Sequence, residues 1–204
     1  MNRYIVLILL IIGVMSHQAM AAETAWEASY RLEVAGQYAD AITALQSGKT
    51  AKKEPELTEL RIAWLHYLQG KYNDAVGHYE SAMKINSDSI DARLGIVLPL
   101  LAQQRWKESE KYLKQVIEAS PWHYTAHVRL MIAEEGQKKW NVLAKHAKEV
   151  SRRYPTDTTV LVYLARASYW AGDGDGAKEA YMKVLNRLPG HFEAVGYLSS
   201  LNKK

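Results

Sequence analysis

Two histidines are the side chains best spaced for chemistry in this sequence. His123 and His127 stand four residues apart in the stretch HYTAH, a spacing at which two imidazoles on one helix can share a metal ion. The glutamate that follows the first histidine in zinc-protease helices is missing, and Pro121 places His123 near the start of its helix. We therefore expect no metal site at these histidines.

Two acidic stretches are also weak candidates. DGDG at residues 173–176 matches part of a calcium loop but lacks the other ligands at their required spacing, and aspartate and glycine are expected as caps and turn formers. Glu134 and Glu135 are helix neighbours that point in different directions, so we expect both to be solvated.

Other chemistry is excluded by motifs and composition. No serine elbow, phosphate loop or dinucleotide fingerprint occurs in the sequence. The absence of cysteine excludes disulfides, thiolate zinc sites and a cysteine nucleophile. The sequence thus predicts no catalytic residue, metal or cofactor, and we expect a protein that is not an enzyme.

The first residues have the plan of a secretory signal. Arg3 precedes an apolar run over residues 4–15, a short polar stretch follows, and Ala19 and Ala21 are small residues where the signal peptidase reads them. An uncleaved anchor is the alternative, but the run is shorter than the roughly 20 residues that span a bilayer. We expect a cleavable signal peptide over 1–21, export to a bacterial periplasm, and no membrane span in the mature form.

The remaining composition is typical of a helical protein with a buried core. Of 204 residues, 48% are hydrophobic and 24% are charged, and prolines number only 5. The formal net charge of +4 is mild, so we expect no nucleic-acid partner for an exported chain without a concentrated basic patch.

The same kinds of residue return along the chain at a fixed step, and this repeat must position any functional side chain. GQYADAI at 36–42 returns as GKYNDAV at 70–76. The turn position holds Gly36, Gly70, Gln104, Lys138 and Gly172. The crossing position, which stands five places after the turn and is small in most copies, holds Ala41, Ala75, Ser109, Leu143 and Ala177.

This pattern resembles the tetratricopeptide repeat family, whose unit is a 34-residue helix–turn–helix. The resemblance implies an all-α fold, a right-handed superhelical array or α-solenoid of five units closed by a C-terminal capping helix over 192–204. The units are 22–55, 56–89, 90–123, 124–157 and 158–191. Because Lys138 and Leu143 replace small residues, we expect a distorted turn and helix crossing in the fourth unit. Pro99 predicts a bend in the first helix of the third unit.

The resemblance also implies a binding surface. In similar proteins the first helices of the units line a concave groove that holds a peptide or partner segment. The positions that face such a groove carry Trp26, Tyr30, Arg61, Trp64, Tyr67, Leu98, Arg129, Tyr163, Arg166, Tyr169 and Trp170, with Asp91, Leu101 and Glu135 beside them. Trp, Tyr and Arg dominate binding hot spots, although Trp64 or Tyr169 can equally serve to pack against the next helix.

Three functions fit these observations. The first is a periplasmic adaptor, scaffold or assembly factor that binds a segment of an exported or envelope protein. The second is a self-assembling structural protein, because open helical arrays have exposed ends that can stack. The third is an accessory factor in exopolysaccharide export, because Tyr and Trp can stack on sugar rings. The sequence does not separate peptide from glycan as the ligand.

Overall fold

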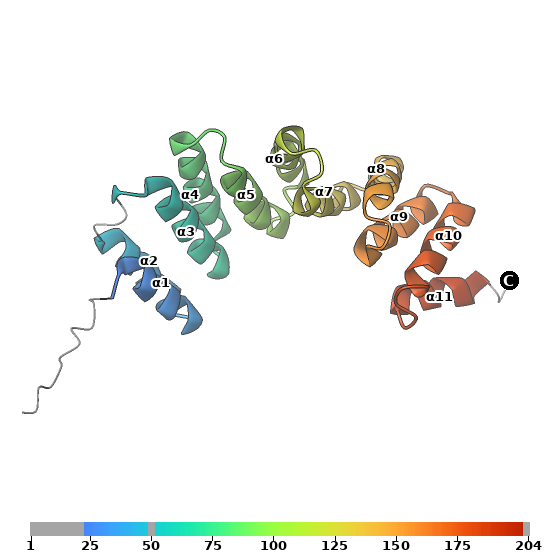
Figure 1. The fold of residues 1–204 in the computed structure, drawn as a ribbon, viewed down its shortest axis with the longest axis horizontal. Coiled ribbons are helices and arrows are strands. Elements are labelled where there is room, and N and C mark those ends of the chain that lie inside the picture. The colour runs from blue at the N-terminus through green and yellow to red at the C-terminus, as the bar shows by residue number, and fades with distance from the viewer. Residues whose placement is uncertain (1–22, 49–51, 202–204) are drawn as a thin grey trace, which may run out of the picture.

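The computed structural model describes residues 23–48 and 52–201, and in them the chain forms eleven α-helices and no strand (Figure 1). The predicted signal peptide, residues 1–21, lies outside the described residues. The helices are α1 Ala25–Val34, α2 Tyr38–Ser47, α3 Pro55–Leu68, α4 Tyr72–Ile85, α5 Ile90–Ala102, α6 Trp106–Ala119, α7 Tyr124–Gly136, α8 Trp140–Arg153, α9 Thr158–Trp170, α10 Gly174–Leu185 and α11 Phe192–Leu201. Within the same ranges, no helix is long and apolar enough to cross a membrane.

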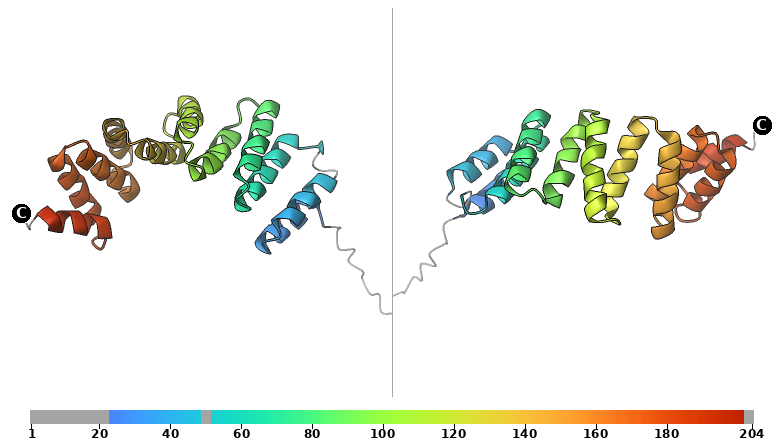
Figure 2. Two further views of the ribbon diagram at one scale, coloured as in Figure 1. Left: turned by 180° about the vertical axis from the view of Figure 1, so that it is seen from behind. Right: turned by 90° about the horizontal axis from the view of Figure 1, so that it is seen from above.

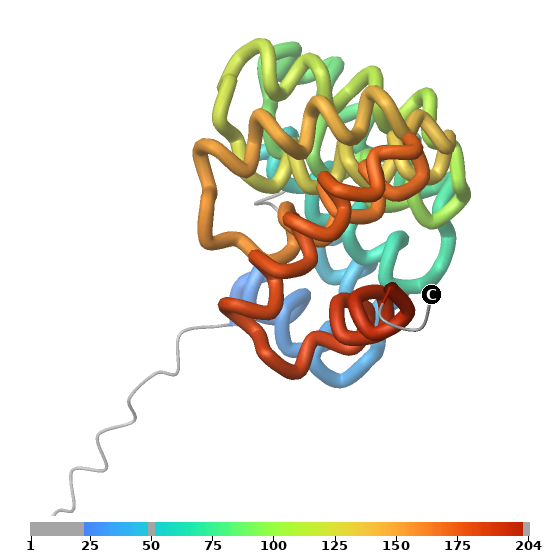
Figure 3. Tube along the Cα trace, turned by 90° about the vertical axis from the view of Figure 1, so that its right-hand side faces the viewer, coloured from blue at the N-terminus to red at the C-terminus, as the bar shows by residue number. Residues whose placement is uncertain are grey.

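The helices form an arch of stacked pairs. In Figure 1, α3, α5, α7 and α9 follow its inner side, while α4, α6 and α8 follow its outer side. The view from above in Figure 2 shows the helices side by side, and the end-on view in Figure 3 shows both ends of the array below its middle. The inner helices α3, α5, α7 and α9 contact one another in sequence, whereas the outer helices contact mainly inner ones. The predicted all-α solenoid is confirmed.

The turn between the two helices of each unit has the same backbone geometry in all five copies. The turn residue has a positive φ: 72° at Gly36, 72° at Gly70, 57° at Gln104, 55° at Lys138 and 87° at Gly172. The next residue donates its N–H to a carbonyl five positions earlier, as Lys71 does to His66 at 2.9 Å. This is the Schellman end of a helix, and a left-handed residue is what it requires.

Side-chain caps explain the two motifs that had suggested metals. His123 is the N-cap of α7, and its Nδ1 accepts a hydrogen bond from the Ala126 N–H at 3.3 Å. Asp173 is the N-cap of α10, and its carboxylate accepts from the Gly176 N–H at 2.8 Å. Both residues therefore satisfy helix ends. Across the described ranges, no three His, Cys, Asp or Glu residues are grouped to hold a metal ion.

The residues at the crossing position lie where paired helices meet. Ala41, Ala75, Ser109 and Ala177 are completely buried. Leu143, also completely buried, takes this place in the fourth unit, and α7 and α8 approach each other less closely than α3 and α4. The expected distortion of the helix crossing is therefore present as a wider approach, because leucine needs more room than alanine.

One local expectation, the distorted turn of the fourth unit, differs from the structure. The turn at Lys138 keeps the geometry of the other turns, so only the helix crossing of the fourth unit is altered. α5 continues through Pro99 to Ala102, and Pro99 is buried in its last turn. Proline has no N–H, so the hydrogen bond from this position back to the Gly95 carbonyl is missing, while the helix itself is not interrupted.

Candidate ligand-binding face

The predicted groove residues lie on α1, α3, α5, α7 and α9, the inner helices of the arch (Figure 1). Tyr30, Tyr169 and Trp170 are the most open, with exposed fractions of 54%, 51% and 60%. Arg61 is buried. The others are half-buried: Trp26, Trp64, Tyr67, Leu98, Arg129, Tyr163 and Arg166.

Arg61 links the first unit to the second. Its guanidinium forms an ion pair with Glu33, and its Nε donates to the Ser29 Oγ at 3.2 Å. The same group lies over the Tyr30 ring, 3.9 Å from its centre. The Trp64 indole N–H donates to the other Glu33 oxygen at 2.9 Å. Arg61 and Trp64 are therefore both engaged by Glu33, a residue that the sequence analysis did not single out.

Arg166 is engaged in the same way near the C-terminal end. It forms two hydrogen bonds with the Glu193 carboxylate, at 2.8 and 2.6 Å, and a longer contact with Glu135 at 3.4 Å. The Tyr181 hydroxyl also donates to Glu193. The Glu193 bonds raise the pKa of Arg166, and the Arg166 bonds lower the pKa of Glu193. Arg166 thus fastens α11 to α9 and α7.

Arg129 is different, because no carboxylate in the described structure lies within ion-pair distance of it. One of its Nη groups donates to the Leu94 carbonyl at 2.8 Å, and burial lowers its pKa. Arg61 and Arg129 are two repeat units apart and so occupy the same place in their units. Moving forward from Glu33 by the same two units leads to Leu101. The partner that neutralises Arg61 is therefore missing from the surroundings of Arg129.

Aromatic rings form two rows beside these arginines. Trp64, Tyr67 and Tyr72 follow one another with centroids 5.5 and 5.9 Å apart. Trp140 stacks on Trp170 at 5.7 Å, and the row continues through Tyr169 to Tyr197. Tyr169 therefore packs edge-on against α11 and still has half of its surface open. The rings of this row can therefore pack against neighbouring helices and still contact a ligand.

A histidine–glutamate network was missed by the sequence analysis, and it corrects the expectation that Glu134 is solvated. Glu134 is 3% exposed and pairs with the His146 Nδ1 at 2.8 Å. The His146 Nε2 lies 2.9 Å from the His127 Nδ1, and the His127 Nε2 lies 2.8 Å from the Pro121 carbonyl. The Pro121 carbonyl can only accept, so the His127 Nε2 donates to it. The chain of hydrogen bonds from Glu134 through both rings to Pro121 joins α7 to α8.

The second unit uses the same three positions. Two units before His127, Glu134 and His146 stand Glu59, His66 and His78. His78 bonds to Glu59 at 2.7 Å and stacks on His66 with centroids 5.1 Å apart. Glutamate and histidine have exchanged places between the two units, while the outer-helix histidine is common to both. A comparison of the sequence with itself at twice the repeat length would have revealed this set.

Comparison with known proteins identifies the repeat. Two family models, each described as a tetratricopeptide repeat, match residues 66–121 and 159–191. The chain is a tetratricopeptide repeat protein. Among curated protein sequences, none matches this one.

Solved structures share this fold at low sequence identity. MamA from Desulfovibrio magneticus RS-1, residues 41 to the end, has a TM-score of 0.71 at 18% identity, with 80% of this chain and 93% of that one covered. A tetratricopeptide repeat protein from Parabacteroides merdae gives 0.75 at 14% identity, with 87% and 70% covered. TTC0263, a tetratricopeptide repeat protein from Thermus thermophilus, gives 0.57 at 16% identity, with 87% and 97% covered. These likenesses show a shared fold, a solenoid of stacked helix pairs.

Proposed function

We propose that this tetratricopeptide repeat protein binds a segment of a partner protein on the inner face of its arch, and that Arg129 receives a carboxylate of that segment. The observation that carries the proposal is the unmatched charge of Arg129. Its equivalent, Arg61, is neutralised by Glu33, whereas the sequence position that corresponds to Glu33 two units further on holds Leu101. A half-buried guanidinium gains most from a carboxylate that it can bind with two hydrogen bonds.

The surroundings of Arg129 suit an extended peptide. Tyr67 on α3 and Leu98 on α5 are half-buried on the inner helices that precede α7, and they offer apolar area on that side of Arg129. Anchors of this kind, grouped around one charged contact, are typical of hot spots. The bound segment would therefore carry one acidic group, a side chain or a chain end, next to apolar residues.

We expect the protein to act in the periplasm, where it would serve as an adaptor or assembly factor without catalytic activity of its own. The features of residues 1–21 support export. Mass spectrometry of the protein from the producing cell tests this part. A chain that begins at Ala22 is expected, and a retained Met1 would contradict it.

The binding proposal is tested by photo-crosslinking in the native compartment. Probes replace Tyr67 and Leu98, and a control probe replaces Lys107, an exposed residue of α6. We expect one and the same protein to be captured from both inner positions and not from the control. Arg129→Gln should reduce this capture about tenfold or more, because it removes a charge-assisted pair. The matched variant Arg153→Gln removes an exposed charge at the end of α8 and should leave capture unchanged.

Two results would overturn the proposal. Equal capture by the parent and by Arg129→Gln would show that the guanidinium has no role. Equal loss in both arginine variants would show that only overall charge matters. A circular dichroism melt of each variant separates these outcomes from unfolding.

A further inference from the structure

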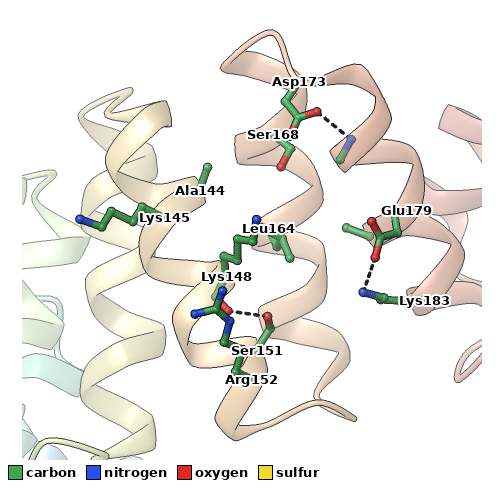
Figure 4. Close-up of a pocket in the computed structure, with 12 residues that line it drawn as sticks. Ala144, Lys145, Lys148, Ser151, Arg152, Leu164, Ser168, Asp173, Glu179 and Lys183 are labelled. Atoms are coloured by element: carbon green, nitrogen blue, oxygen red, sulfur yellow. Dashed lines mark hydrogen bonds and ion pairs between the residues drawn. The ribbon is translucent and has the colours of Figure 1, made fainter.

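A cavity of about 440 Å³ lies on the other side of the array, between the outer helices α8 and α10 and over α9 (Figure 4). Ala144, Leu164 and Ala180 contribute small or apolar surface to it. Its volume falls within the range of sites that hold ligands. None of the predicted groove residues lines this cavity, so it is separate from the inner face.

The helix α8 gives this cavity a basic rim. Lys145, Lys148 and Arg152 are spaced by three and four residues, so they share one side of the helix. In Figure 4, Lys148 and Arg152 reach toward the helix that carries Leu164, whereas Lys145 points outward. The sequence analysis expected no concentrated basic patch, but the fold gathers these residues at one place.

The lysine and arginine side chains that line the cavity from α8 have no acidic partner within the described structure, while the acidic groups of the cavity are already engaged. Lys145, Lys148 and Arg152 form no ion pair there. Glu179 binds Lys183 at 2.6 Å, and Asp173 caps α10 through the Gly176 N–H. The two α8 cations that face the cavity, Lys148 and Arg152, are therefore available for an outside anion.

We propose that this cavity binds an acidic segment of a second partner protein. Lys148 and Arg152 are four residues apart, about 6 Å along the helix axis, which matches two carboxylates on neighbouring turns of a peptide. The apolar side chains beneath them would cover the backbone and small side chains of such a segment. An inorganic anion would leave this apolar surface unused, and a flat lipid surface would not enter a hollow between two helices.

Two sites on opposite sides of the array would let the protein hold two partners at once. The inner face would take one segment through Arg129, and the cavity would take another through Lys148 and Arg152. The second site does not depend on the first, since the residues that carry one site are not part of the other. Failure of one proposal therefore leaves the other standing.

Fluorescence anisotropy with a defined probe tests the cavity. The probe is a dye-labelled twelve-residue peptide of glutamate, alanine and leucine, and the same peptide with glutamine in place of glutamate is its control. We expect the acidic peptide alone to bind at low salt and to be released as the NaCl concentration rises. The double variant Lys148→Gln, Arg152→Gln should weaken binding about tenfold, because two charge pairs are lost.

Matched controls decide the outcome. Lys84→Gln with Lys107→Gln removes the same charge from exposed residues of α4 and α6, and should leave binding within about twofold of the parent. The loss caused by Lys148→Gln with Arg152→Gln should persist in the Arg129→Gln background, so that binding of the probe to the inner face does not mask it. Equal weakening in the Lys84, Lys107 variant, or equal binding of the glutamine peptide, would overturn the proposal. So would binding of phosphate or of anionic phospholipid vesicles in place of the acidic peptide, or a sedimentation shift showing that Lys148 and Arg152 serve only contacts between copies of the chain.

Discussion

At the scale of single residues, the decisive feature of the inner face is which arginine is left without a carboxylate. The sequence placed Arg61, Arg129 and Arg166 at positions predicted to face the groove, and all three lie on inner helices. It could not show that Glu33 and Glu193 neutralise two of them, because those contacts bridge separate units. Only the exchange of Glu33 for Leu101, two units further on, carries this information in the sequence.

The residue scale also yields a prediction about the turns. Lys138 has φ near 55°, a left-handed conformation that costs free energy for residues with a Cβ. Lys138→Gly should raise the free energy of unfolding by roughly 0.5–1 kcal/mol, the gain being reduced by glycine's larger unfolded-state entropy. Thermal melts followed by circular dichroism measure this. Lys138→Ala keeps the Cβ and should give no such gain, so equal stabilisation by both variants would contradict the explanation.

At the scale of helix pairs, α3 with α4 and α7 with α8 each enclose two histidines and a glutamate. Burial lowers the pKa of His127 chiefly by desolvation, and the nearby positive charge of His146 adds to this, while the Pro121 carbonyl, Glu149 and Glu134 oppose it. Desolvation also lowers the pKa of His66, assisted by His78 and opposed by Asp74. The folded state therefore favours the neutral form of both rings.

The sign of the pH dependence follows. A histidine whose folded pKa lies below its unfolded value contributes stability above the ordinary histidine pKa of about 6.5, and this stability is lost as the pH falls through the folded pKa. We expect the free energy of unfolding in urea titrations to decrease as the pH falls below about 6.5. His66→Phe with His127→Gln should flatten this slope. An unchanged slope in the double variant would assign the effect to other groups.

The carboxylate of Glu110 acts in a separate pH range. Desolvation raises its pKa, but hydrogen bonds from Lys114, Lys139 and Gln137 outweigh this effect and lower the pKa to about 2. Its contribution is therefore present above the ordinary glutamate pKa and is lost only below about pH 4.5. Measurements between pH 5 and pH 6.5 thus report on the histidines.

The sequence predicted the helix pairs and their crossings better than it predicted which polar side chains bond to one another between the paired helices. The period of the repeat places Ala75 and Leu143 at the same crossing, and their sizes explain the closer and wider approaches. The burial of Glu134 was not predicted, because its partner His146 lies on the other helix and has no motif around it. Pairing between helices depends on their rotation, which the period alone does not specify.

At the scale of the whole molecule, apolar side chains lie exposed on α11 and just before it. Phe192 is 91% exposed, and Leu188 and Val195 are 48% and 41% exposed. Such side chains are available to a second copy of the chain, as the self-assembling alternative requires. If this alternative holds, the double variant Phe192→Ser, Val195→Ser should have a lower sedimentation coefficient than the parent when both are measured at high concentration. A parent that sediments as a monomer over the whole concentration range would rule out this alternative.

The arrangement of contacts along the arch also has a mechanical consequence. The inner helices α3, α5, α7 and α9 already touch, whereas the outer helices contact mainly inner ones. Bending the arch more tightly would compress closely packed side chains, which resist compression. Bending it the other way would first close spaces between outer helices. The arch therefore has a stiff limit toward tighter curvature and is more compliant toward opening, so a partner too wide for its span can spread it, but one too narrow cannot draw it closed.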